Sequence, residues 1–315
     1  MSQPAPKAGA RPRRQIWSIG GGKGGIGKSL LTAALGWQLA RMGKRVILVD
    51  SDLGGANLHT CLGLHTPERT LGDFIRRRFD RIEDVLVETG VPLLRLISGA
   101  SDFLGAANIK YTQKVRVLNR IRSLEVDVLL LDLGAGTSYN IVDFFLVSDV
   151  GLLTVVPEPT SIENAYRFIK SALYRRLRNA AHNDEVRQTI EAALDAKNTK
   201  GIRTPLDLLA TVEKGHPEEA ATLRRELEAF RPSFVVNQVR EEADAAIGHQ
   251  LVAACARHLG VHSTYVGCVH YDEAVWRSVR ARRLFIADAP RSRAAEDITR
   301  LARVLLQGET LALPW

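Results

Sequence analysis

The residues with the clearest chemical potential form a glycine-rich loop near the start of the chain. Gly22 is followed after four residues by Gly27, Lys28 and Ser29, and the loop lies between an apolar run at 16–19 and a helical pattern at 28–41. Glycines let successive backbone N–H groups turn inward around phosphate oxygens, and the amino end of the next helix adds positive potential there. This order of strand, loop and helix is the phosphate-loop pattern. We therefore expect Lys28 to reach the β- and γ-phosphates of a nucleotide and Ser29 to bind Mg²⁺.

Acidic residues follow two further strand-like runs. The run 46–49 is followed by Asp50 and then by Asp52, and the run 128–131 is followed by Asp132. The carboxyl ends of parallel strands meet at the edge where such sheets bind ligands. An acidic residue at a strand end can also be a simple turn or cap residue. Together with the phosphate loop, however, these carboxylates indicate a magnesium site, with Asp132 on the metal side.

The loop GKGGIGKS contains a second lysine, Lys23, and resembles the deviant phosphate loop of the MinD/ParA group of P-loop ATPases. The segments 50–57 (DSDLGGAN) and 132–136 (DLGAG) resemble the two switch segments of that family. The resemblance implies that Lys23 crosses an ATP-dependent homodimer to contact the partner's phosphates. It also implies that Asp52 orients the attacking water, and that Asp50 holds the magnesium shell.

The same resemblance implies a full set of site residues. The implied catalytic residues are Lys23, Lys28 and Asp52, and the implied metal ligands are Ser29, Asp50, Asp52 and Asp132. The implied nucleotide contacts are Gly22, Lys23, Gly24, Gly25, Ile26, Gly27, Lys28, Ser29, Leu30, Gly136 and Asn237. Asn237 ends a late strand-like run, and its amide has both a donor and an acceptor for an adenine edge. It could equally be an asparagine that terminates a strand.

One segment narrows the resemblance further. The stretch 155–170 (VVPEPTSIENAYRFIK) is similar to a segment of FlhG/FleN-like regulators of flagellar number, and the likeness covers about 16–178 and 233–307. It implies a dimerising switch ATPase that hydrolyses ATP to control spatial organisation, acting on an unidentified protein client. The alternative is a ParA-like partition ATPase with ATP-gated, non-specific DNA binding. An iron–sulfur reductase of the same fold is disfavoured because no cysteine lies near 132–138.

Short apolar runs that alternate with helical patterns predict an α/β fold. We expect a mostly parallel, twisted sheet with helices on both faces. The expected strands are 16–19, 46–49, 94–97, 128–131, 152–156, 234–236 and 264–267, and the expected helices are 28–41, 110–123, 139–147, 161–178, 243–258 and 293–306. A helical insertion is expected at about 179–232 within an ATPase domain at 16–310. A disordered basic arm at 1–15 and a short tail at 311–315 are expected at its ends.

Charge and cysteine content bear on location and partners. The net charge is +8, and the three cysteines (Cys61, Cys255, Cys268) form no metal or disulfide spacing, which indicates a reducing cytoplasm. No apolar run reaches the ~18 residues of a membrane span. Arginine clusters at 76–81, 175–178 and 277–283 are either solvated helix faces or contacts for anionic lipid or DNA. We therefore expect a cytoplasmic protein with potential peripheral contact at the inner face of the membrane, and we read 293–306 as a core helix rather than a membrane anchor.

Overall fold

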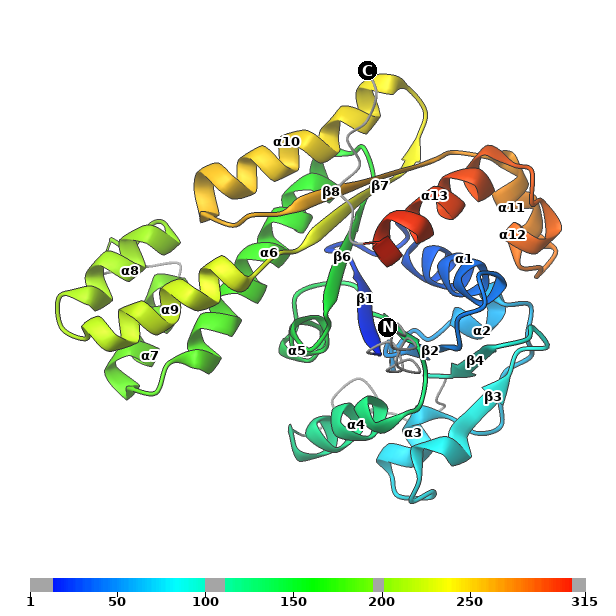
Figure 1. The fold of residues 1–315 in the computed structure, drawn as a ribbon, viewed down its shortest axis with the longest axis horizontal. Coiled ribbons are helices and arrows are strands. Elements are labelled where there is room, and N and C mark those ends of the chain that lie inside the picture. The colour runs from blue at the N-terminus through cyan, green and yellow to red at the C-terminus, as the bar shows by residue number, and fades with distance from the viewer. Residues whose placement is uncertain (1–13, 100–110, 195–200, 308–315) are drawn as a thin grey trace, which may run out of the picture.

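The protein is built around one eight-stranded sheet (Figure 1). The computed structural model describes residues 14–99, 111–194 and 201–307. The strand order is β3-β4-β2-β5-β1-β6-β7-β8, and only the β3–β4 pair is antiparallel. The strands are β1 (Gln15–Gly20), β2 (Val46–Asp50), β3 (Leu86–Glu88), β4 (Leu94–Ile97), β5 (Val128–Asp132), β6 (Val150–Val155), β7 (Ser233–Val239) and β8 (Thr264–His270). The predicted α/β class is confirmed.

The central strands are apolar on both faces because helices cover both sides of the sheet. Every residue of β2 and β5 is buried. Alternate side chains of β5 point to opposite faces, so Leu129 and Leu131 join one hydrophobic cluster while Leu130 joins the other. The continuous apolar runs in the sequence therefore reflect a two-sided core.

The helices divide between these two faces. Buried residues of α3, α4, α5, α6 and α10 belong to one cluster, and those of α1, α2, α12 and α13 belong to the other. The elements are α1 (Lys28–Arg41), α2 (Leu58–Cys61), α3 (Leu71–Ile75), the 3₁₀ turn η1 (Ile82–Val85), α4 (Tyr111–Ser123), α5 (Tyr139–Leu146), α6 (Pro159–Ala180), α7 (Asp184–Leu194), α8 (Pro205–Glu213), α9 (Pro217–Ala229), α10 (Glu242–Leu259), α11 (Glu273–Arg280), α12 (Phe285–Asp288) and α13 (Arg293–Gln307). The apolar face of α13 is buried, as expected for a core helix.

Three helices, α7, α8 and α9, lie between α6 and β7, where the sequence predicts a helical insertion (Figure 1, left). They pack against the second half of α6, and their buried residues extend the hydrophobic cluster of that face of the sheet. Because α6 runs back from the carboxyl end of β6 to the amino end of β7, this unit lies at the amino edge of the parallel strands. The predicted domain boundaries, at 16, 179, 232 and 310, remain predictions.

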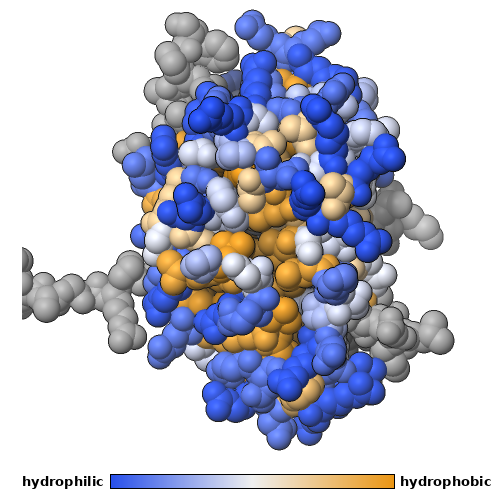
Figure 2. All heavy atoms as spheres, turned by 90° about the vertical axis from the view of Figure 1, so that its right-hand side faces the viewer, coloured by the Kyte–Doolittle hydropathy of each residue, from blue (hydrophilic) through white to orange (hydrophobic). Residues whose placement is uncertain are grey.

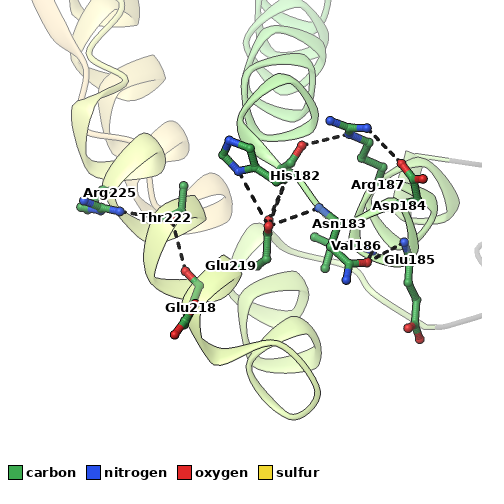
Figure 3. A network of polar contacts seen from close by, with 11 residues as sticks. His182, Asn183, Asp184, Glu185, Val186, Arg187, Glu218, Glu219, Thr222 and Arg225 are labelled. Carbon is green, nitrogen blue, oxygen red and sulfur yellow. Dashed lines mark hydrogen bonds and ion pairs between the residues drawn. The ribbon is translucent and has the colours of Figure 1, made fainter.

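A carboxylate fixes the corner between α6 and α7 (Figure 3). The Glu219 side chain on α9 accepts hydrogen bonds from the backbone N–H groups of His182 (3.1 Å) and Asn183 (3.2 Å). The Asn183 side chain accepts in turn from the backbone N–H groups of Glu185 and Val186, which caps the start of α7. These bonds join α9 and the start of α7 to the end of α6.

Several short elements are not predicted by the sequence patterns. The edge strand β3 has only three residues, and α2, α3 and α12 have four or five, so none shows a periodic pattern. Residues 1–13 of the expected arm, the tail and the first residue of the expected helix at 110–123 lie outside the described residues, whereas Gln15, which was expected in the arm, is the first residue of β1.

The surface exposes few large apolar side chains. Figure 2 shows the side of the molecule that lies at the right in Figure 1, where apolar residues gather in a central band with hydrophilic residues around it. In the described ranges, the exposed large hydrophobic residues are Leu93, Tyr139, Leu194, Leu206, Tyr271, Trp276 and Val279. No described helix is both long enough and apolar enough to cross a bilayer.

Candidate functional site

The glycine-rich loop joins β1 to α1 at the carboxyl edge of the sheet. Gly25 and Gly27 have φ of 76° and 88°, a left-handed conformation that favours glycine. Gly27 precedes the first residue of α1, so the loop opens directly onto a helix amino terminus. A Cβ atom at Gly27 would lie 2.5 Å from Nδ2 of Asn237, so this position needs a glycine for packing as well.

A cavity of about 540 Å³ extends from this loop. Its volume is in the range of small-molecule sites, ~300–1,000 Å³. The predicted site residues that line it are Gly24, Gly25, Gly27, Lys28, Ser29, Leu30, Asp52 and Asn237. The other predicted residues do not line this cavity. Gly22 packs against α6, and Ile26, Asp50 and Asp132 are buried. Lys23 and Gly136 also lie outside the cavity lining.

Lys28 lies in the interior of the site. Its side chain is buried, and Nζ donates a hydrogen bond to the backbone oxygen of Lys23 (3.2 Å). Burial lowers the pKa of the Lys28 ammonium, while the nearby carboxylates of Asp132 and Asp52 oppose that shift. A desolvated ammonium beside carboxylates and a glycine-rich loop is suited to hold an anionic group such as a phosphate.

Asp50 and Asp132 are register partners on the neighbouring strands β2 and β5. Burial, together with the adjacent Asp50 carboxylate, raises the pKa of Asp132 to about 7. Burial likewise raises the pKa of Asp50 to about 6, although backbone N–H groups of Leu58 and Asp52 oppose the shift. Two buried carboxyl groups side by side repel when ionised, and a cation between them and a phosphate would relieve that repulsion.

Asp52 occupies a different environment at the end of β2. Its Oδ1 accepts a hydrogen bond from the backbone N–H of Gly55 (3.0 Å) and its side chain is half-buried. It lines both the phosphate-loop cavity and a second cavity of about 710 Å³ between the two predicted switch segments. A Cβ atom at Gly134 would lie 3.1 Å from Cγ of Asp52, so the glycine at this position lets the carboxylate pack closely against the second segment.

Lys23 makes its contacts within the chain. Its Nζ donates to Oε2 of Glu158 (2.7 Å) and to Oγ1 of Thr160 (3.4 Å), at the start of α6. The Lys23 and Glu158 side chains are 41% and 54% exposed, so water screens the pair and it can open at little energetic cost. The expected contact of Lys23 with a partner's phosphates remains a prediction.

Asn237 contacts the phosphate loop directly. Its Nδ2 donates a hydrogen bond to the backbone oxygen of Ile26 (2.8 Å). The amide therefore joins β7 to the loop, and its proposed role in reading adenine remains a prediction. At this end the cavity is also lined by Gln238, His270, Tyr271 and Asp272.

Some residues near the site are not predicted from the sequence. The hydroxyl of Thr32 lies 3.2 Å from Oδ1 of Asp132 and is fully buried, and Glu158 holds Lys23. Thr32 lies one helical turn after Lys28, on the face of α1 that meets β5, which is a signal that helical spacing could have provided. Glu158 carries no such signal, because its contact spans 135 residues.

Residues 17–285 match the profile described as the CobQ/CobB/MinD/ParA nucleotide-binding domain (CbiA). The chain belongs to this family. This member of the CobQ/CobB/MinD/ParA family is 33% identical over 207 residues to the antiactivator FleN of Pseudomonas aeruginosa. The match covers 63% of this chain and 73% of that protein.

Other family members give the same assignment. The flagellum site-determining protein YlxH of Helicobacter pylori is 31% identical over 158 residues, which is 49% of this chain and 52% of that protein. The septum site-determining protein MinD of Pyrococcus horikoshii, solved with Mg-ADP, superimposes with a TM-score of 0.63 at 20% identity, covering 95% of this chain and all of that one. The fold is thus that of a MinD-like P-loop protein, and the predicted FleN-like resemblance is confirmed.

The arginine clusters of this family member are largely neutralised by carboxylates. In the first cluster Arg76 and Arg78 pair with Asp73, and in the second Arg176 pairs with Glu226. The other pairs in these clusters are Arg81–Glu83, Arg175–Asp143 and Arg178–Glu191. In the third cluster, Arg277 lies 3.9 Å from Glu273, Arg283 pairs with Asp288, and Arg280 stacks on Trp276.

Proposed function

We propose that this chain is a Mg²⁺-dependent ATPase that dimerises on binding ATP and acts as a switch in spatial organisation. The observation that carries the proposal is the convergence of Lys28, the phosphate loop and three strand-end aspartates at one edge of the sheet. Lys28 and the loop N–H groups would hold the β- and γ-phosphates. Hydrolysis would release the dimer and its client.

The residues present fit a magnesium ion. Mg²⁺ favours oxygen ligands and is commonly held by one or two carboxylates, water and substrate phosphates. Within the described ranges no group of three or more His, Cys, Asp or Glu side chains is placed to hold a metal alone. Ser29 would therefore bind the ion together with nucleotide phosphates, and Asp50, Asp52 and Asp132 would hold its water shell. The bound ion would neutralise charge that develops on the phosphates.

The chain's own residues account for the remaining steps. Asp52, half-buried beside Gly134, would orient the attacking water, because its free carboxylate edge faces both cavities. Lys23 would leave Glu158 and supply positive charge to the partner's γ-phosphate, as an arginine finger does. Exchange of a screened surface pair for a phosphate contact is energetically favourable.

The biological role is proposed from the relatives. FleN is an antiactivator, YlxH determines a flagellum site and MinD determines a septum site. We propose the corresponding class for this chain: control of flagellar number or placement, or positioning of a polar or division structure, through an unidentified protein client. A cytoplasmic location with peripheral contact at the inner membrane face is part of the same proposal.

The test is the Asp52→Ala variant. We expect ATP hydrolysis to fall to background in a phosphate-release assay, while ATP-induced dimerisation, measured by light scattering, is retained. Asp80→Ala, which removes an exposed carboxylate outside the site, should leave both unchanged. Normal hydrolysis by Asp52→Ala would show that this residue does not orient the water.

The alternative of an ATP-gated DNA-binding partition protein receives less support. In two of its three candidate arginine clusters most of the arginines pair with carboxylates, such as Arg76 with Asp73 and Arg176 with Glu226. Binding of duplex DNA with ATP across a salt series separates the two functions, because non-specific binding through phosphates weakens steeply with salt.

A further inference from the structure

The second turn of α1 carries a buried hydroxyl that the proposed function does not use. Thr32 follows Lys28 by one helical turn and is fully buried. Its Oγ1 donates to the backbone oxygen of Lys28 (2.9 Å) and lies 3.2 Å from Oδ1 of Asp132. The Asp132 residue is only 2% exposed, so this contact is shielded from bulk water. One hydroxyl therefore joins the phosphate-loop helix to the carboxylate at the end of β5.

The position of this hydroxyl is fixed by its own helix. A threonine in a helix has few allowed χ1 rotamers, and one of them bonds the backbone oxygen four residues earlier. The bond from Thr32 to Lys28 is of this kind, so Oγ1 is held at a defined place beside Asp132. The hydroxyl has a single proton, and a bond to an ionised carboxylate is the stronger of its two choices. Thr32 is thus suited to hold the carboxylate once Asp132 is ionised.

The surroundings of Asp132 make such a contact important. Burial and the register partner Asp50 raise the pKa of Asp132, whereas side-chain hydrogen bonds from Ser29 and Thr32 oppose this shift and favour the ionised form. Ser29 lines the nucleotide cavity and is proposed to bind the metal ion itself. Thr32 does not line the cavity, so it can act on a bound ion only through Asp132.

We infer that Thr32 is a positioning residue, which holds the Asp132 carboxylate in place for the water shell of the magnesium ion. The inference deepens the proposed function and rests on it, since it requires that Asp132 serve a magnesium ion beside a nucleotide. Thr32 touches neither the ion nor the nucleotide in this arrangement. Loss of its hydroxyl should therefore weaken the contribution of Mg²⁺ to nucleotide binding and leave the metal-free affinity unchanged.

The experiment measures ADP affinity by calorimetry with saturating Mg²⁺ and again with EDTA. The ratio of the two affinities is the magnesium gain, and ADP is used so that neither dimerisation nor hydrolysis enters the result. Thr32→Val keeps the shape and the branching of the side chain but removes the hydroxyl. We expect the magnesium gain to fall about tenfold, as for the loss of a hydrogen bond to a charged group, with the affinity in EDTA unchanged.

Two further variants separate positioning from packing. Thr32→Ser keeps the hydroxyl and should recover most of the magnesium gain, whereas a packing role would make serine the more damaging replacement because it also removes the methyl group. In the double variant Thr32→Val with Asp132→Asn, the magnesium gain should equal that of Asp132→Asn alone. Two residues that act through one contact are not additive in this way.

The matched control is Thr299→Val on α13. Thr299 makes the same bond to the backbone oxygen four residues earlier, at Ala295 (2.9 Å), and lies outside the cavity lining. Its replacement should leave both affinities unchanged. An unchanged magnesium gain in Thr32→Val, or an equal loss with Mg²⁺ and with EDTA, would overturn the inference and leave the proposed function intact. A wild-type chain that binds ADP equally well with Mg²⁺ and with EDTA would contradict the magnesium dependence in the proposed function, and the inference with it.

Discussion

At the scale of single residues, the site depends on a few close approaches. Gly27 lies beneath the Asn237 amide, Gly134 lies against Asp52, and Lys28 is enclosed with its ammonium on the loop. The Gly27 contact explains part of why the pattern predicts the loop so well, because both its φ and the nearby Asn237 amide disfavour any other residue there. Glu158 could not be predicted in this way, since its contact with Lys23 depends on which distant segments become neighbours.

Gly27→Ala tests the tightest of these approaches. The new Cβ atom would meet Nδ2 of Asn237 at 2.5 Å, and alanine disfavours φ of +88°. We expect ADP affinity, measured by calorimetry, to fall about tenfold or more, because the loop N–H groups lose their alignment with the phosphates. Gly43→Ala is the control: its φ is +81° with no atom within 4 Å, so it should lose stability but bind ADP normally.

Asp132→Asn tests the repulsion between the buried carboxyl groups. In nucleotide-free protein with EDTA, we expect this variant to have a thermal midpoint at least about 2 °C above wild type at pH 8. Because the folded-state pKa of Asp132 is raised to about 7, its ionisation destabilises the wild type as pH rises through that value. The gain should therefore shrink as pH falls from 8 to 5. A gain that is constant across this range would contradict the prediction.

At the scale of elements, α5 is held by ionic contacts beside the second switch segment. Asp143 on α5 contacts Lys114 on α4 and Arg175 on α6, and all three side chains are at most 17% exposed. Burial alone would raise the pKa of Asp143, but the hydrogen bonds from Arg175 and Lys114 more than offset it and lower the pKa. The ionic group thus joins three helices that follow different strands. The sequence alone indicated only that Arg175 belongs to an arginine cluster, not that it is buried in such a group.

Asp143→Ala should be strongly destabilising. Removal of one partner from a buried ionic group costs about 3–5 kcal/mol, because the remaining charges lose their compensation. We expect a loss of this size in the free energy of unfolding from urea titration. Glu163→Ala on α6 is a matched comparison, since its pair with Arg167 is about two-thirds exposed, and it should cost no more than about 0.5 kcal/mol. Similar losses in both variants would show that Asp143 is not buried as described.

At the scale of the whole molecule, the α7–α9 unit shares its core with the sheet. Buried residues of these helices belong to the same hydrophobic cluster as β5, β6 and β7. The absence of a strand pattern at 179–232 predicts helices there, but not that they would pack on the second half of α6. That packing depends on contacts such as the ion pair of Arg176 with Glu226, 50 positions later, which no local pattern reveals.

Leu223→Ala tests whether this shared core makes the molecule one cooperative unit. Leu223 is fully buried on α9, and its truncation should cost about 2–5 kcal/mol. Calorimetry should show a single transition in both wild type and variant, with ADP shifting the whole transition upward by mass action. Two separate transitions, with only one moved by Leu223→Ala, would show that the three helices fold independently.

The direction of α6 separates the α7–α9 unit from the nucleotide site. Its 22 residues begin beside Lys23 and the phosphate loop and end at the amino edge of the sheet, so the far end of α6, where the α7–α9 unit begins, lies about 30 Å from its start. A macromolecule bound to those three helices would compete for space neither with a nucleotide nor with a second subunit at the loop. Substitutions on the exposed faces of these three helices should therefore leave the nucleotide site unchanged.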